Sequence, residues 1–270
     1  MKLAISNLAW NIEEDEAIKQ VLIEEKISSI EVAPTKLWSN PTTVNEEEIS
    51  KVIQFWGNDN INIVAMQSLL FGKPELAIFN EEHNRVTMLT YLKHIIETGA
   101  KLGAKYFVFG SPKNRQINSI TNAKTNIAID FFTQLGEISK KNNVFFCIEP
   151  NPKLYDCDFI TNTQEAIDLI KCVNHPGFQL HLDAAALTLN NENLERSIEA
   201  AAPYLKHFHI SSPYLGEITD KRVNHLAISK ALKSIDYTNY VSIEMKTISE
   251  TNNLDIVRAN LQYAKEFYES

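Results

Sequence analysis

The chain has 270 residues, of which 44% are hydrophobic and 22% are charged. This balance is typical of a globular protein that buries a full core, and it excludes a disordered or fibrous chain. The formal net charge of −8 argues against nucleic acid as the main partner, because proteins that bind a phosphate backbone usually present a basic face.

Strand-like and helix-like segments alternate from one end of the chain to the other. The predicted strands are short apolar runs, and they cover residues 2–7, 27–33, 61–66, 106–109, 144–149, 178–183, 206–210 and 240–244. The predicted helices repeat apolar residues at helical spacing, and they cover residues 11–26, 45–56, 83–102, 122–141, 163–173, 192–202, 224–235 and 254–268. This alternation predicts a parallel sheet with right-handed crossovers.

The number of strand and helix pairs favours a closed barrel over an open sheet. Length alone does not decide the number of domains, since α/β barrels of about 250 residues are routinely single. The chain has only 8 glycines and contains neither a GxGxxG dinucleotide turn nor a P-loop. We therefore predict a single (β/α)8 TIM barrel that forms one domain over residues 1–270.

The cysteines and the apolar runs bear on where the protein works. Cys147, Cys157 and Cys172 form no CxxC pair, which suits a reducing compartment. No apolar run approaches 18 residues, and no targeting segment precedes the first predicted strand. We expect a cytoplasmic protein with no membrane contact.

Four consecutive predicted strands end on side chains that bind metals. The side chains are Glu149, Asp183, His209 and Glu244, and neighbours in this series lie 26 to 35 residues apart, about one strand plus one helix. The period of two along a strand turns each of them to the same face as polar neighbours such as His181, His207 and Ser242. In a parallel barrel all four would meet at the end where active sites are built.

Three carboxylates and one imidazole form a plausible set of ligands for one divalent cation. Oxygen donors favour Mn, Mg or Co, and the imidazole keeps Zn possible; we place manganese first. Buried without a cation, the carboxylates would repel one another and shift their pKa values. Any one of these residues alone is more often a solvated acid or a satisfied core histidine, but four on consecutive strands favour a metal site.

The chain resembles the xylose-isomerase-like TIM barrels of the sugar phosphate isomerase and epimerase group. The resemblance covers essentially the whole chain, and the motifs that carry it are IEP at 148–150, LD at 182–183, HFH at 207–209 and IE at 243–244. It implies that Glu149, Asp183, His209 and Glu244 hold one divalent metal. It also implies that Glu149 and Glu244 act as acid and base on opposite faces of the carbon that loses its proton, through a metal-bound enediolate.

Two positions depart from the pattern of the epimerases in this group. Those enzymes commonly have a substrate-binding histidine three residues after the metal aspartate and an arginine six residues after the metal histidine. This sequence has Ala186 and Leu215 there. The departures leave the metal site intact but put a 3-epimerase activity on a free ketose in doubt.

Other residues are predicted to bind the substrate or to support the ligands. Lys113 and Arg115, in the loop after the fourth strand, and Lys246, beyond Glu244, would hold an anionic group or an oxyanion. Four further residues near strand ends would line the remaining wall, and they are Glu31, Gln67, Trp10 and Trp38. His181 and His207, one step deeper in their strands, would orient the metal ligands.

Three functions stay open at this point. The first is a metal-dependent isomerase or epimerase of a small sugar, sugar phosphate or other sugar derivative. The second is a dehydratase that expels a hydroxyl with help from Lys246 or His207, and the third is a barrel that binds a sugar without turnover. The paired glutamates favour catalysis, because a binding module has no need of two proton-transfer groups. We expect no nucleic-acid partner, and a homo-oligomer is possible.

Overall fold

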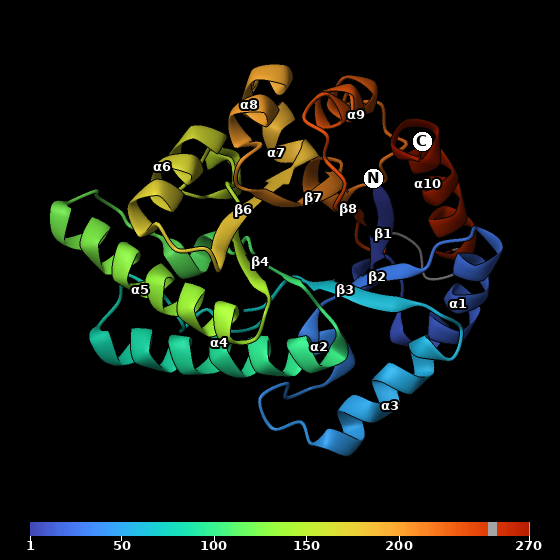
Figure 1. The fold of residues 1–270 in the computed structure, drawn as a ribbon, viewed down its shortest axis with the longest axis horizontal. Coiled ribbons are helices and arrows are strands. Elements are labelled where there is room, and N and C mark those ends of the chain that lie inside the picture. Colours follow the sequence, from blue (N-terminus) through green and yellow to red (C-terminus); the bar gives the residue numbers. More distant parts are fainter. Residues whose placement is uncertain (248–252, 270) are drawn as a thin grey trace.

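The computed structural model describes residues 1–247 and 253–269, and its centre is a closed barrel of parallel strands (Figure 1). Each strand pairs with the next in the chain, and the last strand closes on the first. The strands are β1 (Lys2–Ser6), β2 (Ser29–Val32), β3 (Asn62–Met66), β4 (Tyr106–Phe109), β5 (Phe145–Ile148), β6 (Phe178–Asp183), β7 (Leu205–Ser211) and β8 (Tyr240–Glu244). The predicted (β/α)8 barrel is confirmed.

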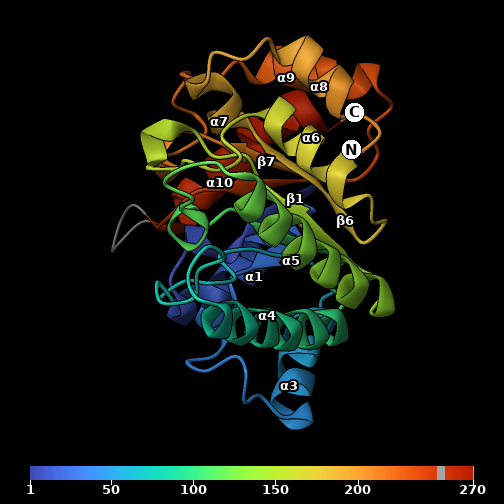
Figure 2. The ribbon, with the colours of Figure 1, turned by 90° about the vertical axis from the view of Figure 1, so that its left-hand side faces the viewer.

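The helices surround the barrel, and Figure 2 shows α3, α4 and α5 packed one beside the next. The helices are α1 (Asp15–Glu24), α2 (Pro34–Leu37), α3 (Glu46–Gly57), α4 (Glu82–Leu102), α5 (Asn122–Lys141), α6 (Thr163–Val173), α7 (Ala184–Leu189), α8 (Leu194–Ala201), α9 (His225–Ser234) and α10 (Asn253–Tyr268). Because β8 pairs with β1, α10 packs against α1 and brings the last helix beside the first. No described helix is both long enough and apolar enough to cross a membrane.

The predicted element bounds agree closely with the structure, with a few physical exceptions. The predicted helix 11–26 begins as a 3-10 turn, Ile12–Glu14, before α1 starts. The connection after β2 contains α2, a helix that is not among the predicted ones, and Pro34 opens it at its first position. The predicted helix 192–202 is α8, and α7 directly after β6 was not predicted.

Local sequence signals explain where several helices begin and end. Asn45 accepts a hydrogen bond from the main chain of Glu48, whose carboxylate in turn accepts from the Asn45 amide, and this capping box opens α3. Thr121 caps α5 by accepting a hydrogen bond from the Lys124 amide. The long helix α4 ends at Gly103, whose φ of 102° is in the left-handed region that glycine tolerates best.

The apolar core lies between the outer face of the barrel and the helices. Phe109 of β4 packs edge-on against Phe132 of α5, and Phe132 stacks on Phe178 of β6. A smaller buried cluster closes the inside of the barrel near the start of the strands, where the rings of Tyr106 and His207 stack 5.3 Å apart. The interior above this cluster is polar, which is costly unless its groups are paired.

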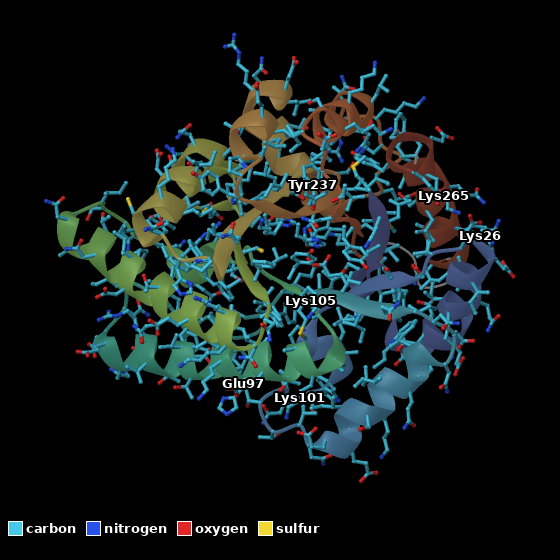
Figure 3. All side chains as sticks on the ribbon, in the orientation of Figure 1. Lys26, Glu97, Lys101, Lys105, Tyr237 and Lys265 are labelled. Carbon is cyan, nitrogen blue, oxygen red and sulfur yellow. The ribbon has the colours of Figure 1, made fainter. Side chains whose placement is uncertain are left out.

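The strand register places polar side chains side by side at the far end of the barrel. Lys26, Lys105 and Tyr237, labelled in Figure 3, precede β2, β4 and β8 and so mark the end where the strands begin. At the opposite end Asp183 of β6 is the register partner of His209 of β7. This arrangement follows from parallel pairing, in which strand ends share one edge.

Candidate active site at the carboxyl ends of the strands

Four strand-end residues converge at the mouth of the barrel, as their sequence positions predict. Ligand atoms of Glu149, Asp183 and His209 all lie within 4.8 Å of one another. Glu244 Oε2 lies 3.3 Å from His209 Nδ1. Asp183 and His209 are buried, and Glu244 is partly exposed. The structure thus groups three carboxylates around one imidazole.

Asp183 is held in place by the helix that follows it. Its Oδ1 accepts a 2.6 Å hydrogen bond from the Ala186 amide, so that Asp183 is the N-cap of α7. Its Oδ2 accepts from the Ser211 hydroxyl, and Ser211 Oγ accepts from the Ala185 amide at 3.0 Å. The sequence DAAA at 183–186 therefore ends a strand, caps a helix and fixes a carboxylate in four residues.

Glu149 is held by its main chain and by a close approach of Gly110. Its amide donates to the Phe109 carbonyl at 3.2 Å, and its carbonyl accepts a 2.7 Å hydrogen bond from Arg115 Nη2. A Cβ atom at Gly110 would lie 1.9 Å from Glu149 Oε2. Asn151 Nδ2 donates to the Gly110 carbonyl at 2.9 Å and ties the two loops together. The carboxylate thus occupies space that only glycine leaves free.

Burial and like charge perturb the acids of this group. Burial, together with the neighbouring Glu244 and Asp183, raises the pKa of Glu149 well above its ordinary value. Burial and then Glu244 raise the pKa of Asp183 to about 6. Burial opposes the charged form of His209, but the carboxylates of Glu31 and Glu244 outweigh it and hold its pKa well above the ordinary value. The site attracts positive charge.

A divalent cation fits this set of donors. Among the described residues, the buried His209 Nδ1 has no hydrogen-bond partner, although it faces the carboxylate of Glu244. Buried polar atoms without a partner are rare in native proteins and call for a specific explanation. Glu149, Asp183, His209 and Glu244 would supply oxygen and nitrogen ligands, and a cation would offset the repulsion that raises the pKa values of the acids.

A cavity of about 500 Å³ opens above the four residues. Glu149, Asp183 and Glu244 form part of its wall, and the loops after β3, β4, β5, β7 and β8 form the rest. The size and the position are those of a small-molecule site in a TIM barrel. Of the residues predicted to bind substrate, Gln67 and Lys246 line this cavity.

The two basic residues predicted after β4 lie elsewhere. Arg115 is fully buried, and its guanidinium donates to the main-chain carbonyls of Glu149 and Phe109 and lies over the Phe109 ring. The carbonyls at the ends of β4 and β5 need donors, and the 3-10 helix Pro112–Arg115 turns Arg115 toward them. Lys113 on the same turn is exposed and does not line the cavity. Arg115 therefore holds the main chain of Glu149 in place through its carbonyl.

The aromatic and acidic wall residues are also placed differently from the prediction. Trp10 is fully buried, and its Nε1 donates to Asp15 Oδ1 at 2.7 Å. Trp38 packs partly buried against the core and lines a separate shallow depression. Glu31 is buried beneath the cavity, where it contacts His207 and His209. These side chains stabilise the barrel and its interior, and none of the three lines the cavity.

The structure adds cavity-lining residues beyond the substrate-binding candidates named from the sequence. Tyr155 and Tyr214 both line the cavity and meet edge to face with ring centres 5.6 Å apart, and Tyr155 Oη accepts a hydrogen bond from the Tyr214 amide. The polar residues missed by sequence reasoning are Ser68, Ser111, Asn151, Ser211 and Ser212. Among these, Asn151 could have been predicted to line the cavity, because it lies in the loop that follows Glu149.

The loop after β7 has an unusual backbone where it lines the cavity. Tyr214 and Leu215 have φ values of 64° and 58°, in the left-handed region that costs such side chains free energy. The Lys246 amide donates to the Leu215 carbonyl at 3.0 Å and holds this conformation against the end of β8. Leu215 thus presents an apolar side chain to the cavity.

Gly110→Ala should reduce activity strongly while leaving the fold intact. The new methyl group would meet the end of the flexible Glu149 side chain, which can move aside, but the carboxylate would then be misplaced. A displacement of about 1 Å costs about 10²-fold in rate when it affects a catalytic group. Gly57→Ala is the matched control, because nothing lies within 4 Å of its added methyl group. Turnover by Gly110→Ala equal to that of Gly57→Ala would contradict the close fit.

The raised pKa of Asp183 predicts how stability depends on pH in the chelator-treated protein. The folded state holds the proton up to about pH 6, whereas the group's ordinary pKa is 3.8. Because the folded state binds this proton more tightly than the unfolded state, protonation of Asp183 stabilises the fold. This stabilisation is fully present below about pH 4 and is lost as pH rises through about 6. The free energy of unfolding, measured in urea, should fall across this window relative to Asp183→Asn, by about 1.4 kcal/mol per unit of pKa difference. A difference that grows with pH would contradict the assignment.

The chain matches one family model and two curated proteins. A family model described as a xylose isomerase-like TIM barrel matches residues 22–267. The D-psicose 3-epimerase of Ruminiclostridium cellulolyticum is 25% identical over 122 residues, which are 43% of this chain and 40% of that protein. The L-ribulose 3-epimerase of Methylomonas sp. is 27% identical over 90 residues, or 33% of this chain and 32% of that protein. The chain thus aligns with less than half the length of these curated relatives.

Solved structures match over the full length and show the same fold. The D-psicose 3-epimerase of Clostridium cellulolyticum H10 with D-tagatose superposes with a TM-score of 0.84 at 15% identity and covers 100% of both chains. A 3-keto-D-glucoside 4-epimerase from E. coli gives 0.81 at 18% identity, covering 98% of this chain and 99% of that one. The IOLI protein with a bound zinc atom gives 0.75 at 18% identity, with 100% of both chains covered.

Proposed function

Because the chain belongs to the xylose isomerase-like TIM barrel family, we propose that it is a divalent-metal-dependent isomerase or epimerase of a small sugar or sugar derivative. The observation that carries this proposal is the meeting of Glu149, Asp183 and Glu244, which line one cavity, with the buried His209 beside them. The curated relatives that match are named epimerases and support an enzyme that acts on sugars.

The proposed reaction moves a proton from and to a carbon beside a carbonyl group. Glu149 removes the proton, and Glu244 returns a proton to the same carbon or to its neighbour; the roles reverse for the opposite substrate. Burial and the neighbouring acids Glu244 and Asp183, which raise the pKa of Glu149, make its carboxylate a stronger base than an exposed glutamate. A divalent cation held by the four residues would act as a Lewis acid toward the oxygen charge that develops.

The chemistry of the donors also orders the candidate metals. Three carboxylates and one imidazole favour manganese and admit magnesium, cobalt and zinc. Lys246 is the cationic side chain among the described residues that line the cavity, so we place an anionic or developing negative oxygen of the substrate near it. A cytoplasmic location and a homo-oligomeric state remain predictions from the sequence.

The dehydratase hypothesis is the nearest rival, and the structure bears on which residue could act as its acid. His207, one of its two candidate acids, is fully buried, stacks on Tyr106 and lies outside the cavity lining. Lys246, the other of the two candidates, lines the cavity and is placed to protonate a leaving hydroxyl. A dehydratase would therefore depend on Lys246 for the step that an epimerase does not need.

Deuterium exchange separates these functions. The purified protein is analysed for bound metal, loaded with manganese and incubated in D₂O with a panel of ketoses, their phosphates and keto-sugar derivatives. We expect deuterium to enter one of these compounds without loss of water. Loss of water from the substrate would favour the dehydratase, and no exchange over the panel with metal-loaded protein would contradict the proposal. Chelator-treated protein is the control.

A further inference from the structure

A fully buried carboxylate lies directly beneath the candidate metal site. Glu31 Oε2 is 3.0 Å from His209 Nε2 and 3.3 Å from His207 Nε2, and none of the three side chains is exposed. Glu31 lies on β2, across the barrel from β7. The register between β2 and β3 shifts between Ile30 and Glu31, at the point where this side chain enters the interior.

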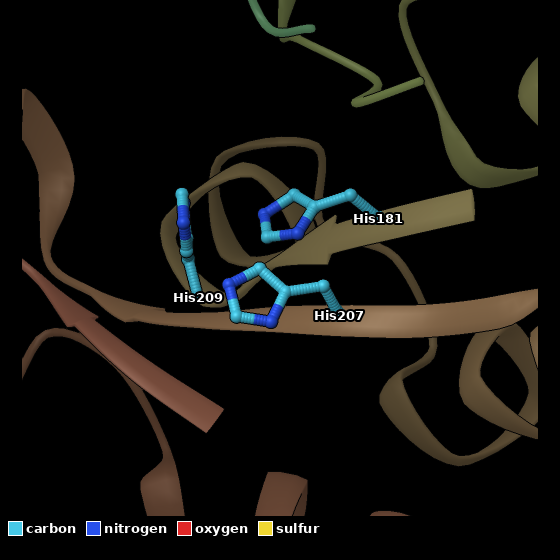
Figure 4. A group of neighbouring side chains, drawn as sticks. All are labelled: His181, His207 and His209. Atoms are coloured by element: carbon cyan, nitrogen blue, oxygen red, sulfur yellow. The ribbon is translucent and has the colours of Figure 1, made fainter. Parts of the chain in front are cut away.

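The imidazoles around this carboxylate hold one another in fixed orientations. Figure 4 shows His181, from β6, grouped with His207 and His209, from β7. The rings of His181 and His209 meet edge to face with centres 4.0 Å apart, and His207 stacks flat on Tyr106. His209 therefore has little freedom to rotate about its χ angles, and its two nitrogens face different neighbours.

The two nitrogens of His209 have different partners. Nε2 faces Glu31 Oε2 inside the barrel, and Nδ1 faces Glu244 Oε2 in the cavity wall. Both imidazoles approach the same oxygen of Glu31, at 3.0 Å from His209 Nε2 and 3.3 Å from His207 Nε2, as two donors to one carboxylate do. An ionised carboxylate only accepts hydrogen bonds, so the nitrogen that faces it carries the proton. The lone pair of a neutral His209 ring is then on Nδ1.

We propose that Glu31 is a positioning residue for the metal ligand His209, which it holds in the tautomer and orientation that direct the Nδ1 lone pair toward the cation. This inference rests on the proposed metal-dependent function. A carboxylate hydrogen-bonded to the far nitrogen of a ligating histidine fixes the ring and raises its basicity as a ligand. Because Oε2 accepts from both His207 and His209, one carboxylate oxygen orients two rings at once.

The test compares two substitutions of similar size. Glu31→Gln keeps a carbonyl oxygen that accepts the hydrogen bond but removes the charge, whereas Glu31→Leu removes both. We expect Glu31→Leu to weaken manganese binding in calorimetry by about 10- to 100-fold, and Glu31→Gln to retain most of the affinity. Ser29→Ala is the control, since it removes another buried polar side chain two residues earlier on the same strand. It should bind manganese as the native protein does.

A second readout follows the tautomer directly. In ¹⁵N-histidine spectra of the zinc-loaded native protein, His209 should carry its proton on Nε2, with the slow exchange of a buried hydrogen bond. Glu31→Leu should lose that protected signal, and circular dichroism establishes that the variant is folded. If Glu31→Leu fails to fold, the comparison of Glu31→Gln with native protein in the same spectra still decides, because a proton on Nδ1 in either one contradicts the proposal.

The outcomes separate this inference from the proposed function. Native protein that binds no divalent cation would overturn the proposed function. Native protein that binds one cation, with the same affinity in Glu31→Leu, would overturn only the role of Glu31. Binding of two cations per chain, with one lost in Glu31→Leu, would make Glu31 and the buried histidines ligands of a second metal and would also overturn the positioning role.

Discussion

Replacing Glu149 by glutamine should reduce exchange of substrate hydrogen with solvent by about 10²- to 10⁴-fold, the usual contribution of a general base. Glutamine has the size of glutamate, and the main-chain hydrogen bonds to Phe109 and Arg115 do not depend on the side chain. The fold should therefore remain, while the group that removes the proton is lost. Deuterium wash-in measured by NMR at saturating manganese gives the rate and separates weaker metal binding from lost proton transfer.

The matched control for this substitution is Glu97→Gln. Glu97 lies on the outer side of α4, where Figure 3 labels it, and its carboxylate is 3.9 Å from Lys93. Removing that charge changes the net charge by the same amount but leaves the site untouched, and exposed pairs of this kind contribute little to stability. Wash-in by Glu149→Gln at the rate of Glu97→Gln would remove Glu149 from the mechanism.

Replacing Asp183 by asparagine should abolish tight metal binding without unfolding α7. Asparagine is as good an N-cap as aspartate, so its side-chain oxygen can still accept from the Ala186 amide. Removing a residue that only supports a ligand costs about 10- to 100-fold in affinity, and removing the ligand itself should cost more than about 100-fold. Calorimetry with manganese measures the loss.

Thermal unfolding provides an independent measure of the same loss. A cation at 100 times its dissociation constant stabilises the native protein by about 2.7 kcal/mol, and Asp183→Asn should show almost none of this gain. Asp183→Ala removes the cap as well, and should cost about 1 kcal/mol more than Asp183→Asn in the absence of metal. An Asp183→Asn protein that gains as much from manganese as the native protein would show that Asp183 is not a ligand.

The ends of the strands are the part of the site that sequence reasoning locates best. The bounds of β4, β6 and β8 agree with the predicted strands, because apolar runs between helices leave little choice of register. The period of two then decides which side chains enter the barrel, and parallel pairing collects Asp183, His209 and Glu244 at one edge. These are local properties that the sequence carries directly.

The loops and the deeper interior depend on contacts that no local pattern specifies. Arg115 lies in a loop whose composition suits an anion site, but the carbonyls of Phe109 and Glu149, at the ends of β4 and β5, lie within reach and accept hydrogen bonds from its guanidinium. Glu31 was expected in the cavity wall, and the register shift beside it lies in the pairing with β3 rather than in its own sequence. Helix α7 was missed because it has only six residues and follows β6 without a loop.

The cap that Asp183 provides has a consequence for changing the substrate of this protein. Ala186 is joined through its own amide to the carboxylate of a candidate metal ligand, so its position is fixed relative to that ligand. The preceding residue, Ala185, lines the cavity, and its amide donates to Ser211 Oγ, so a side chain introduced there by design would be carried on a rigid support. Position 185 is therefore a natural place to graft new substrate contacts, and helix α7 would hold them in register with Asp183.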